Sequence, residues 1–221
     1  MTNEEILTHV DHTLLKAVAT WEDIKQIAED SIKYNTASIC IPQSYIKRLH
    51  DTYGDKINIC TVVGFPLGYN STESKIVEVK QALEDGANEI DMVINIGDCK
   101  DHNYQKIEDE IRALKQACGN HILKVIIETC YLTEEEKIAM CEAVTNAKAD
   151  YIKTSTGFGS AGATMEDILL FKKHIGPNVK MKAAGGIRSV QDMKDYLEVG
   201  VDRLGTSSAI KLIQGEEAKG Y

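Results

Sequence analysis

Residues 148–153 read KADYIK, and related hexapeptides occur at 35–40 (NTASIC), 86–91 (GANEID) and 200–205 (GVDRLG). Each has a small or β-branched second residue, usually Asn or Asp third, and usually Ile or Leu fifth. The four segments coincide with every second one of eight apolar, β-branched runs, and stretches of helical period separate the runs. Alternating strand and helix predict a parallel sheet, and eight such units in 221 residues predict a single-domain (β/α)8 TIM barrel. A doubly wound open sheet is the alternative, but the repeat on alternate strands favours the barrel, whose interior layers come from alternate strands.

The expected strands and helices follow from these two periods. The strand runs are VDHTLL near residue 10, TASICI near 36, INICTVV near 57, NEIDMVI near 88, ILKVIIE near 122, DYIKTS near 150, VKMKAA near 179 and VDRLG near 201. Helical period marks 20–33, 72–86, 133–144 and 164–177. In the first helix Ile24, Ile27, Ala28 and Ile32 are expected on one buried side, and Thr133 with Glu136 has the spacing of a capping box.

Composition limits the partners and the compartment. The chain carries 25 basic and 34 acidic residues, a net charge of −9, and has no basic run long enough to bind nucleic acid. It has neither an apolar signal core nor a membrane-spanning run, so we expect a cytoplasmic, soluble protein. The six cysteines show no C-x-x-C pairing and are expected as reduced, buried thiols. Residues 1–221 are expected to form one domain, with 214–221 as a flexible tail.

The sixth position of the hexapeptide carries the first functional signal. It holds Cys40, Asp91, Lys153 and Gly205. Since alternate strands fill one interior layer of a barrel, these four residues should share a layer. That composition is unusual for a packed core and is typical of the floor of an active site.

A second lysine is expected beside Lys153. In KMKAAGGIR (180–188), period two places Lys180, Lys182 and Ala184 on one face and Val179, Met181 and Ala183 on the other. If the apolar face packs against the helices, Lys182 points into the barrel beside the neighbouring strand that carries Lys153. A single strand lysine is usually solvated or ion-paired, but two inward lysines beside Asp91 are harder to explain in that way.

Two converging amines suggest a particular chemistry. Like charges about 5 Å apart at an effective dielectric of ~20 repel by roughly 3 kcal/mol, which lowers the pKa of one amine. A neutral amine can form a Schiff base with a carbonyl compound, and the iminium is an electron sink for making or breaking the adjacent carbon–carbon bond. The other lysine stays protonated, and Asp91 can transfer protons directly or through water. The spacing alone does not identify which lysine is the nucleophile.

Glycines and hydroxyls follow the last three strands. AAGGIRS supplies Gly185 and Gly186, and RLGTSSA supplies Gly205, Ser207 and Ser208. Glycine lets backbone N–H groups approach an anion, and hydroxyls add donors. Barrels usually bind phosphate at this place. The STGFG segment adds Gly157, whereas Arg188 either assists or is simply solvated.

Seven motifs in order make the chain resemble the deoxyribose-phosphate aldolase family nearly from end to end. They are DHTLLK near the start, TVVGFPLG (61–68), EIDMVINIG (89–97), LKVIIET (123–129), DYIKTSTGF (150–158), KAAGGIRS (182–189) and RLGTSSA (203–209). The resemblance implies a class I aldolase on a TIM barrel, without a metal or other cofactor, in deoxyribonucleotide catabolism. Its reaction interconverts 2-deoxy-D-ribose 5-phosphate with D-glyceraldehyde 3-phosphate and acetaldehyde.

The resemblance also implies roles for residues. Lys153 in KTSTG is the Schiff-base lysine, Lys182 in KAAGG the cationic and proton-relaying partner, and Asp91 the proton donor and acceptor. The positions implied for phosphate are Gly157, Gly185, Gly186, Ser207 and Ser208. Asp11 and Thr154 match positions near the substrate hydroxyls. Independently of the resemblance, Cys40 is expected to border the pocket without a chemical duty, because it belongs to the same predicted layer as Lys153.

Two departures and two rival functions remain. Cys130 stands where family members often have Gly, which leaves the shape of that loop open. The chain ends in Tyr221, which either assists proton transfer, as in some members, or belongs to a disordered tail. A metal-dependent aldolase or isomerase would need clustered histidines and carboxylates, yet only His9 and His12 are close in sequence. A noncatalytic sugar-phosphate-binding barrel would leave the paired lysines unexplained, and the resemblance favours a homodimer.

Overall fold

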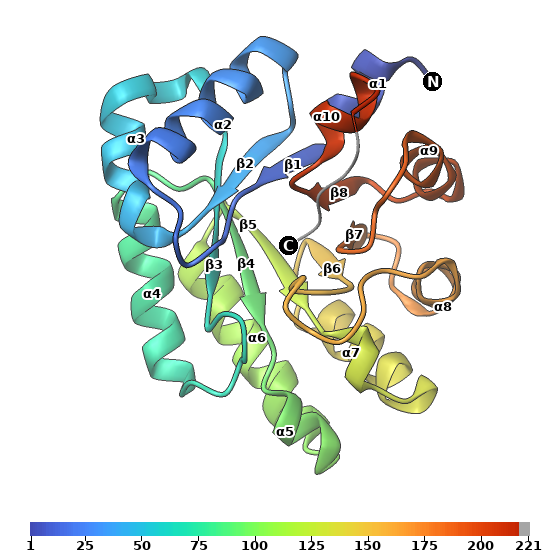
Figure 1. The fold of residues 1–221 in the computed structure, drawn as a ribbon. Coiled ribbons are helices and arrows are strands. Elements are labelled where there is room, and N and C mark those ends of the chain that lie inside the picture. Colours follow the sequence, from blue (N-terminus) through green and yellow to red (C-terminus); the bar gives the residue numbers. More distant parts are fainter. Residues whose placement is uncertain (217–221) are drawn as a thin grey trace.

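A closed barrel of parallel strands forms the centre of the protein, as the computed structural model of residues 1–216 shows (Figure 1). The eight strands pair in sequence order, and β8 closes the sheet against β1. Their bounds are β1 Val10–Thr13, β2 Ser38–Ile41, β3 Ile59–Val63, β4 Glu89–Val93, β5 Ile122–Ile126, β6 Tyr151–Lys153, β7 Lys180–Ala184 and β8 Arg203–Thr206. The predicted (β/α)8 barrel is therefore confirmed, and the open sheet is excluded.

Helices surround the barrel in the described residues. They are α1 Asn3–Leu7, α2 Trp21–Tyr34, α3 Ile46–Tyr53, α4 Thr72–Glu84, α5 Ile96–Lys100, α6 Tyr104–Cys118, α7 Glu134–Asn146, α8 Met165–His174, α9 Val190–Val199 and α10 Ala209–Ile213. Short 3-10 turns lie at Gln43–Tyr45, Gly54–Lys56 and Thr129–Tyr131. In residues 1–216, none of the helices has the length and apolarity needed to cross a bilayer.

Local sequence signals explain where several helices begin and which faces they bury. Thr133 and Glu136 form the predicted capping box at the start of α7. In α2 Ile24 and Ala28 are fully buried, but Ile32 is 40% exposed, so its predicted place on the buried face is wrong. Ser31 continues the buried face of α2, because it lies almost two full turns beyond Ile24, whereas Ile32 is rotated by about 80° from Ile24.

The strands separate an apolar layer from a polar interior. Outward residues such as Ile39, Ile90 and Ala183 belong to one continuous apolar core shared with the helices. A small separate cluster, formed by Leu15, Cys40, Cys60 and Val62 with Phe65 against it, lies apart from that core. The outer layer therefore supplies most of the apolar burial, and the barrel interior is left for polar side chains.

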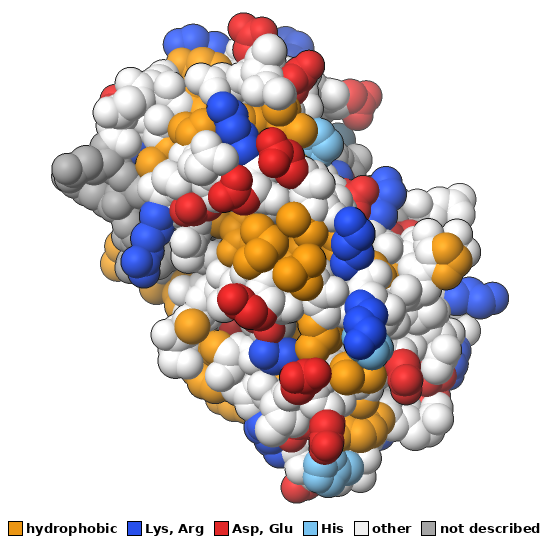
Figure 2. All heavy atoms as spheres, turned by 90° about the vertical axis from the view of Figure 1, so that its right-hand side faces the viewer, with side chains coloured by type: hydrophobic (Ala, Val, Ile, Leu, Met, Phe, Trp, Pro, Cys, Tyr) orange, Lys and Arg blue, Asp and Glu red, His pale blue; other side chains and the backbone are white. Residues whose placement is uncertain are grey.

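The surface carries charges of both signs. On the face seen in Figure 2, Lys and Arg side chains are interspersed with Asp and Glu around a central group of hydrophobic side chains. All six cysteines are free thiols, as predicted. Five are buried, but Cys130 is only half-buried, so the expectation of burial is wrong for that residue.

A buried ion pair ties α4 to α6 outside the barrel. The amine of Lys75 donates to the backbone oxygen of Val93 at 2.9 Å and pairs with Glu110 at 2.9 Å. Lys75 is fully buried, and a Cβ at Gly64 would lie 2.7 Å from its Cε. Glycine at position 64 therefore makes room for the lysine stem beneath the loop after β3.

Lys75→Ala should lower the free energy of unfolding by about 3–5 kcal/mol, because it leaves the Glu110 carboxylate buried without its cation. Urea unfolding followed by circular dichroism measures this loss. The double variant Lys75→Met with Glu110→Leu should recover most of it, since no unpaired charge remains. Lys47→Ala, which removes an exposed pair with Asp51, serves as the control and should cost less than about 1 kcal/mol. A loss no larger for Lys75→Ala than for this control would contradict the prediction.

Candidate active site

Asp91, on β4, accepts hydrogen bonds from three lysines inside the barrel. Its Oδ2 lies 2.7 Å from the amine of Lys153 and 2.7 Å from that of Lys182, and its Oδ1 lies 2.8 Å from that of Lys124. Lys153 and Lys182 are direct neighbours in the register of β6 and β7. The predicted convergence of two inward amines beside this carboxylate is therefore present, and both lysines are shielded from solvent, at 4% and 0% exposure.

Two further carboxylates complete the network. Asp11 on β1 contacts the amine of Lys182 and lies 3.4 Å from that of Lys124. Glu89 on β4 lies 2.6 Å from the Lys124 amine, and its two oxygens accept from the Arg203 guanidinium at 3.1 and 3.2 Å. The barrel interior thus holds a connected charge network of four basic and three acidic side chains, which we call the interior network. Its members are Asp11, Glu89, Asp91, Lys124, Lys153, Lys182 and Arg203.

The network has clear electrostatic consequences. Burial alone would raise the pKa of Asp91, but the cations of Lys124, Lys153 and Lys182 outweigh it and hold this pKa well below its usual range. Burial would lower the pKa of Lys182, yet Asp11 and Asp91 raise it above its ordinary value. Near neutral pH, Asp91 is therefore an anion and Lys182 an ammonium ion.

Lys124, Glu89 and Arg203 were not singled out from the sequence. Glu89 and Arg203 each share a strand face with a predicted inward residue: Glu89 is two residues before Asp91, and Arg203 two before Gly205. Period two therefore contained the signal. The sixth position of the hexapeptide marks only one residue of each inward face, and the residue two positions earlier on the same face carries no such mark.

The other two members of the predicted layer also lie at this level. A Cβ at Gly205 would come within 3.1 Å of Lys182 Cε and 2.9 Å of Ala184 Cβ, so glycine leaves room for the lysine. Cys40 Sγ lies within 4.8 Å of both the Asp91 carboxylate and Cys60 Sγ. The predicted layer of Cys40, Asp91, Lys153 and Gly205 therefore comes together.

Thiols and carboxylates of the interior also form two groups of metal-ligand type. They are Cys40, Cys60 and Asp91, and Asp11, Cys60 and Glu89. The Lys124 amine already lies 3.2 Å from Cys60 Sγ and contacts the carboxylates of both groups. A metal cation would have to compete with these buried ammonium groups, so the donor set fits a cation poorly.

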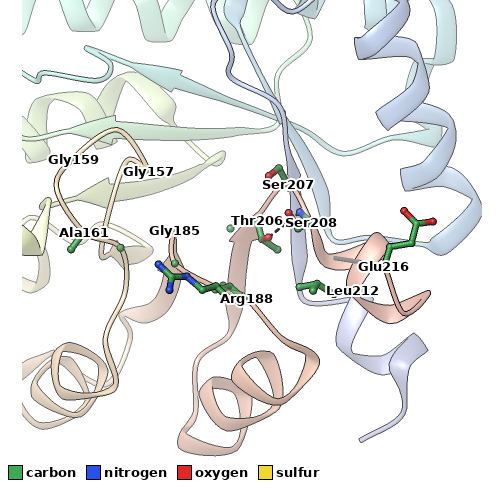
Figure 3. Close-up of a pocket in the computed structure, with 14 residues that line it drawn as sticks. Gly157, Gly159, Ala161, Gly185, Arg188, Thr206, Ser207, Ser208, Leu212 and Glu216 are labelled. Carbon is green, nitrogen blue, oxygen red and sulfur yellow. Dashed lines mark hydrogen bonds between the residues drawn. The ribbon is translucent and has the colours of Figure 1, made fainter. Parts of the chain in front are cut away.

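A cavity of about 620 Å³ opens at the ends of β6, β7 and β8. Figure 3 shows the loop after β6 with Gly157, the turn after β7 with Gly185, and the turn after β8 with Ser207 and Ser208 around it. All six residues predicted for phosphate line it: Gly157, Gly185, Gly186, Gly205, Ser207 and Ser208. Gly157, Gly185 and Gly186 have φ values of 88°, 73° and 72°, which favour glycine. Arg188 also lines the cavity and is exposed.

The remaining residues predicted for the site do not line this cavity or lie outside the described residues. Thr154 is fully buried, and its hydroxyl exchanges hydrogen bonds with the backbone of Ala184. Asp11 is likewise buried and belongs to the interior network, so neither residue lines the cavity, and their contact with substrate hydroxyls stays a prediction. Cys130 lies in the Thr129–Tyr131 turn with its Sγ 4.0 Å from Glu128. Tyr221 and the rest of the tail from 217 lie outside the described residues.

Comparison with known proteins finds aldolases that are similar to this chain in sequence and in fold. A profile of the family described as DeoC/LacD family aldolase matches residues 6–214. A deoxyribose-phosphate aldolase from Clostridium botulinum (strain Alaska E43 / Type E3) is 73% identical over 221 residues, covering 100% of both chains. One from Clostridioides difficile (strain 630) is 54% identical over 218 residues, covering 99% of this chain and 100% of the other. The tetrameric deoxyribose phosphate aldolase of Aeropyrum pernix superimposes with a TM-score of 0.87 at 28% identity, covering 97% of this chain and 92% of that one.

The charge network should make stability depend on pH at both ends of the scale. The folded pKa values of Asp11 and Asp91 lie below the unfolded value of about 3.9, so their contribution is present above that pH and is lost as the pH falls. The folded pKa values of Lys124 and Lys182 lie above about 10.4, so their contribution is present below that pH and is lost as the pH rises.

Urea midpoints measured from pH 2.5 to 11 test this dependence. Asp11→Asn should flatten the acid arm of the curve, whereas the exposed control Asp51→Asn should leave it as in the wild type. Identical acid arms in Asp11→Asn and the wild type would show that the interior carboxylates do not shape stability.

Proposed function

Because the chain belongs to the DeoC/LacD family of aldolases, we propose that it reversibly cleaves 2-deoxy-D-ribose 5-phosphate to D-glyceraldehyde 3-phosphate and acetaldehyde through a lysine Schiff base. The observation that carries the proposal is the placing of two amines, Lys153 and Lys182, on one oxygen of Asp91. Gly205 links this pair to the cavity, since it lines the cavity and leaves space for Lys182. The aldehyde carbon of the sugar would then lie at the two amines, and its phosphate would lie in the adjoining cavity.

Charge balance favours Lys153 as the nucleophile. The interior network has four basic and three acidic side chains, so one of the four cations is in excess. Lys182 contacts two carboxylates and Lys124 three, whereas Lys153 contacts Asp91 alone. Lys153 is thus the lysine with the fewest carboxylates to balance a positive charge. An uncharged Lys153 leaves three cations facing three anions in the interior network.

The proposed reaction begins with addition of the Lys153 amine to the C1 aldehyde of the open-chain sugar. Loss of water gives the iminium ion. Removal of the C3 hydroxyl proton breaks the C2–C3 bond, whose electron pair moves into the iminium to form an enamine and release D-glyceraldehyde 3-phosphate. Protonation of the enamine carbon and hydrolysis then release acetaldehyde and restore the amine.

Lys182 and Asp91 are proposed to move the protons of these steps. The raised pKa of Lys182 and the lowered pKa of Asp91 place the resting proton on the lysine. Lys182 therefore donates the proton with which the hydroxyl of the Lys153 carbinolamine leaves as water, and Asp91, 2.7 Å from both amines, conveys protons between them. The cavity glycines and serines would hold the phosphate through backbone and hydroxyl donors.

The proposal includes two binding partners: the sugar substrate and a second copy of the chain. The substrate class is a phosphorylated sugar, and the homodimer stays a prediction that gel filtration with light scattering can test. The tetramer described for the Aeropyrum pernix protein shows that assembly differs from what we predict in at least one solved structure of this fold.

Borohydride reduction in the presence of acetaldehyde should attach a two-carbon group to Lys153, because reduction traps the imine as a stable secondary amine. Peptide mapping by mass spectrometry locates the adduct. Lys153→Leu should abolish it, and an excess of a strong chelator should leave it unchanged. A wild-type protein that gains no adduct on any interior lysine would refute the Schiff-base proposal, and turnover abolished by the chelator would favour the metal-dependent rival.

Lys182→Ala should leave the barrel folded but reduce trapping at neutral pH by about tenfold or more, because the cation that disfavours a protonated neighbour is gone. Trapping should recover as the pH is raised toward 10. Lys180→Ala is the matched control, since it removes an exposed lysine from the same strand. Trapping in Lys182→Ala that equals the control at pH 7 would refute the charge coupling.

A further inference from the structure

Glu128 is a buried carboxylate with a left-handed backbone conformation, two residues beyond the end of β5. Its exposure is 2%, and it takes part in none of the ion pairs found in residues 1–216. Its φ and ψ of 53° and 66° lie in the left-handed region, which disfavours a residue with a long side chain. A buried acid held in an unfavourable backbone conformation therefore needs compensating contacts.

The contacts come from the loop that follows Lys153. The backbone N–H of Thr156 lies 3.2 and 3.3 Å from the two Glu128 carboxylate oxygens, and the Thr156 hydroxyl donates to Oε2. That hydroxyl oxygen accepts in turn from the backbone N–H of Phe158 at 3.0 Å. A chain of hydrogen bonds thus runs from the carboxylate through one hydroxyl to the backbone two residues farther on.

The same carboxylate also meets the far side of the loop. A Cβ at Gly159 would lie 3.1 Å from Glu128 Cδ, 3.1 Å from Oε1 and 2.9 Å from Cys130 Sγ. Glycine at this position lets the backbone return against the carboxylate. The loop therefore touches Glu128 at Thr156 and again at Gly159, and between these two points lies Gly157, with φ 88°, on the wall of the cavity.

We propose that Glu128 is a positioning residue that sets the place of Gly157 in the cavity wall and so controls binding of the phosphate group. The inference rests on the proposed function, because it assigns the cavity to the phosphate of the sugar. Glu128 does not itself line the cavity; it acts through Thr156. Its effect should accordingly fall on recognition of the phosphate and spare the formation of the Schiff base.

The need for a carboxylate follows from its donors and acceptors. Both Thr156 groups that face Glu128 are donors, and an ionised carboxylate offers only acceptors. A glutamine side chain keeps the shape but has one acceptor and an NH₂ group that would face a donor. Glu128→Gln therefore perturbs the loop with little change in packing, whereas Thr156→Ser retains both donors.

The experiment compares two substrates and one ligand that does not react. For Glu128→Gln, KM for 2-deoxyribose 5-phosphate should rise by about tenfold, as expected when a well-placed anion contact is lost. Binding of inorganic phosphate, measured by calorimetry, should weaken by a similar factor. Turnover of unphosphorylated 2-deoxyribose, and borohydride trapping of acetaldehyde at Lys153, should change by less than about twofold, because neither uses the phosphate cavity.

Matched variants separate positioning from general damage. Thr156→Val should reproduce the phosphate-specific loss, Thr156→Ser should restore nearly wild-type KM, and Cys130→Ala should leave KM unchanged although its thiol lies beside the same carboxylate. Adding Glu128→Gln to Thr156→Val should cause little further loss, since both break one chain of hydrogen bonds. Full additivity of the two substitutions would overturn the assignment.

The remaining outcomes are also decisive. Equal losses with the phosphorylated and unphosphorylated sugars, or loss of trapping at Lys153, would overturn the proposal because Glu128 would then support the chemistry or the fold as a whole. Unchanged phosphate binding in Glu128→Gln would overturn it as well. Failure of the proposed function looks different: the wild type would neither trap acetaldehyde nor cleave the sugar, while phosphate binding would still depend on Glu128.

Discussion

The buried carboxylate of Asp91 is the contact on which the interior of the barrel depends. Three lysine amines lie 2.7 to 2.8 Å from its two oxygens, and none of the three lysines is more than 4% exposed. Burying an ion without a partner costs several kcal/mol, and breaking a buried pair leaves the partner's charge uncompensated. Without Asp91, the three amines would face one another with fewer carboxylates between them. The contacts of Asp91 therefore do two things at once: they hold the lysine amines in the arrangement that the proposed chemistry needs, and they balance the charges inside the barrel.

The location of this network explains how the fold tolerates it. The outward faces of the strands and the inner faces of the helices share a continuous apolar core, while the small cluster around Cys40 and Cys60 lies apart from it. Apolar burial outside the barrel can stabilise the fold independently of what fills the inside. The interior therefore does not need to be a well-packed apolar core. Closure of the sheet brings charged side chains from β1, β4, β5, β6, β7 and β8 into one connected network.

Much of this was predictable because a strand has a simple period. Alternation placed Lys182 inward, the hexapeptide repeat placed Lys153 and Asp91 on one level, and the glycine-rich strand ends marked the cavity. Lys124 and Glu89 were missed although they share the inward faces, because a charged residue in a strand is usually solvated, and its partner comes from another strand. The proposed role of Glu128 was not predicted, although the LKVIIET motif contains the residue, since its backbone angle and its contact with Thr156 arise only when two loops meet.

The interior network has one cation more than it has anions. This excess helps to explain how Lys153 and Lys182 can have different proposed roles although their amines contact the same oxygen of Asp91. Lys182 is held between Asp11 and Asp91, so removal of its proton would leave two carboxylates with one fewer cation. Lys153 has only Asp91, which Lys124 and Lys182 also neutralise. Two chemically identical side chains in register on adjacent strands thus meet different numbers of carboxylates. The difference arises because three lysine amines and the Arg203 guanidinium share only three carboxylates.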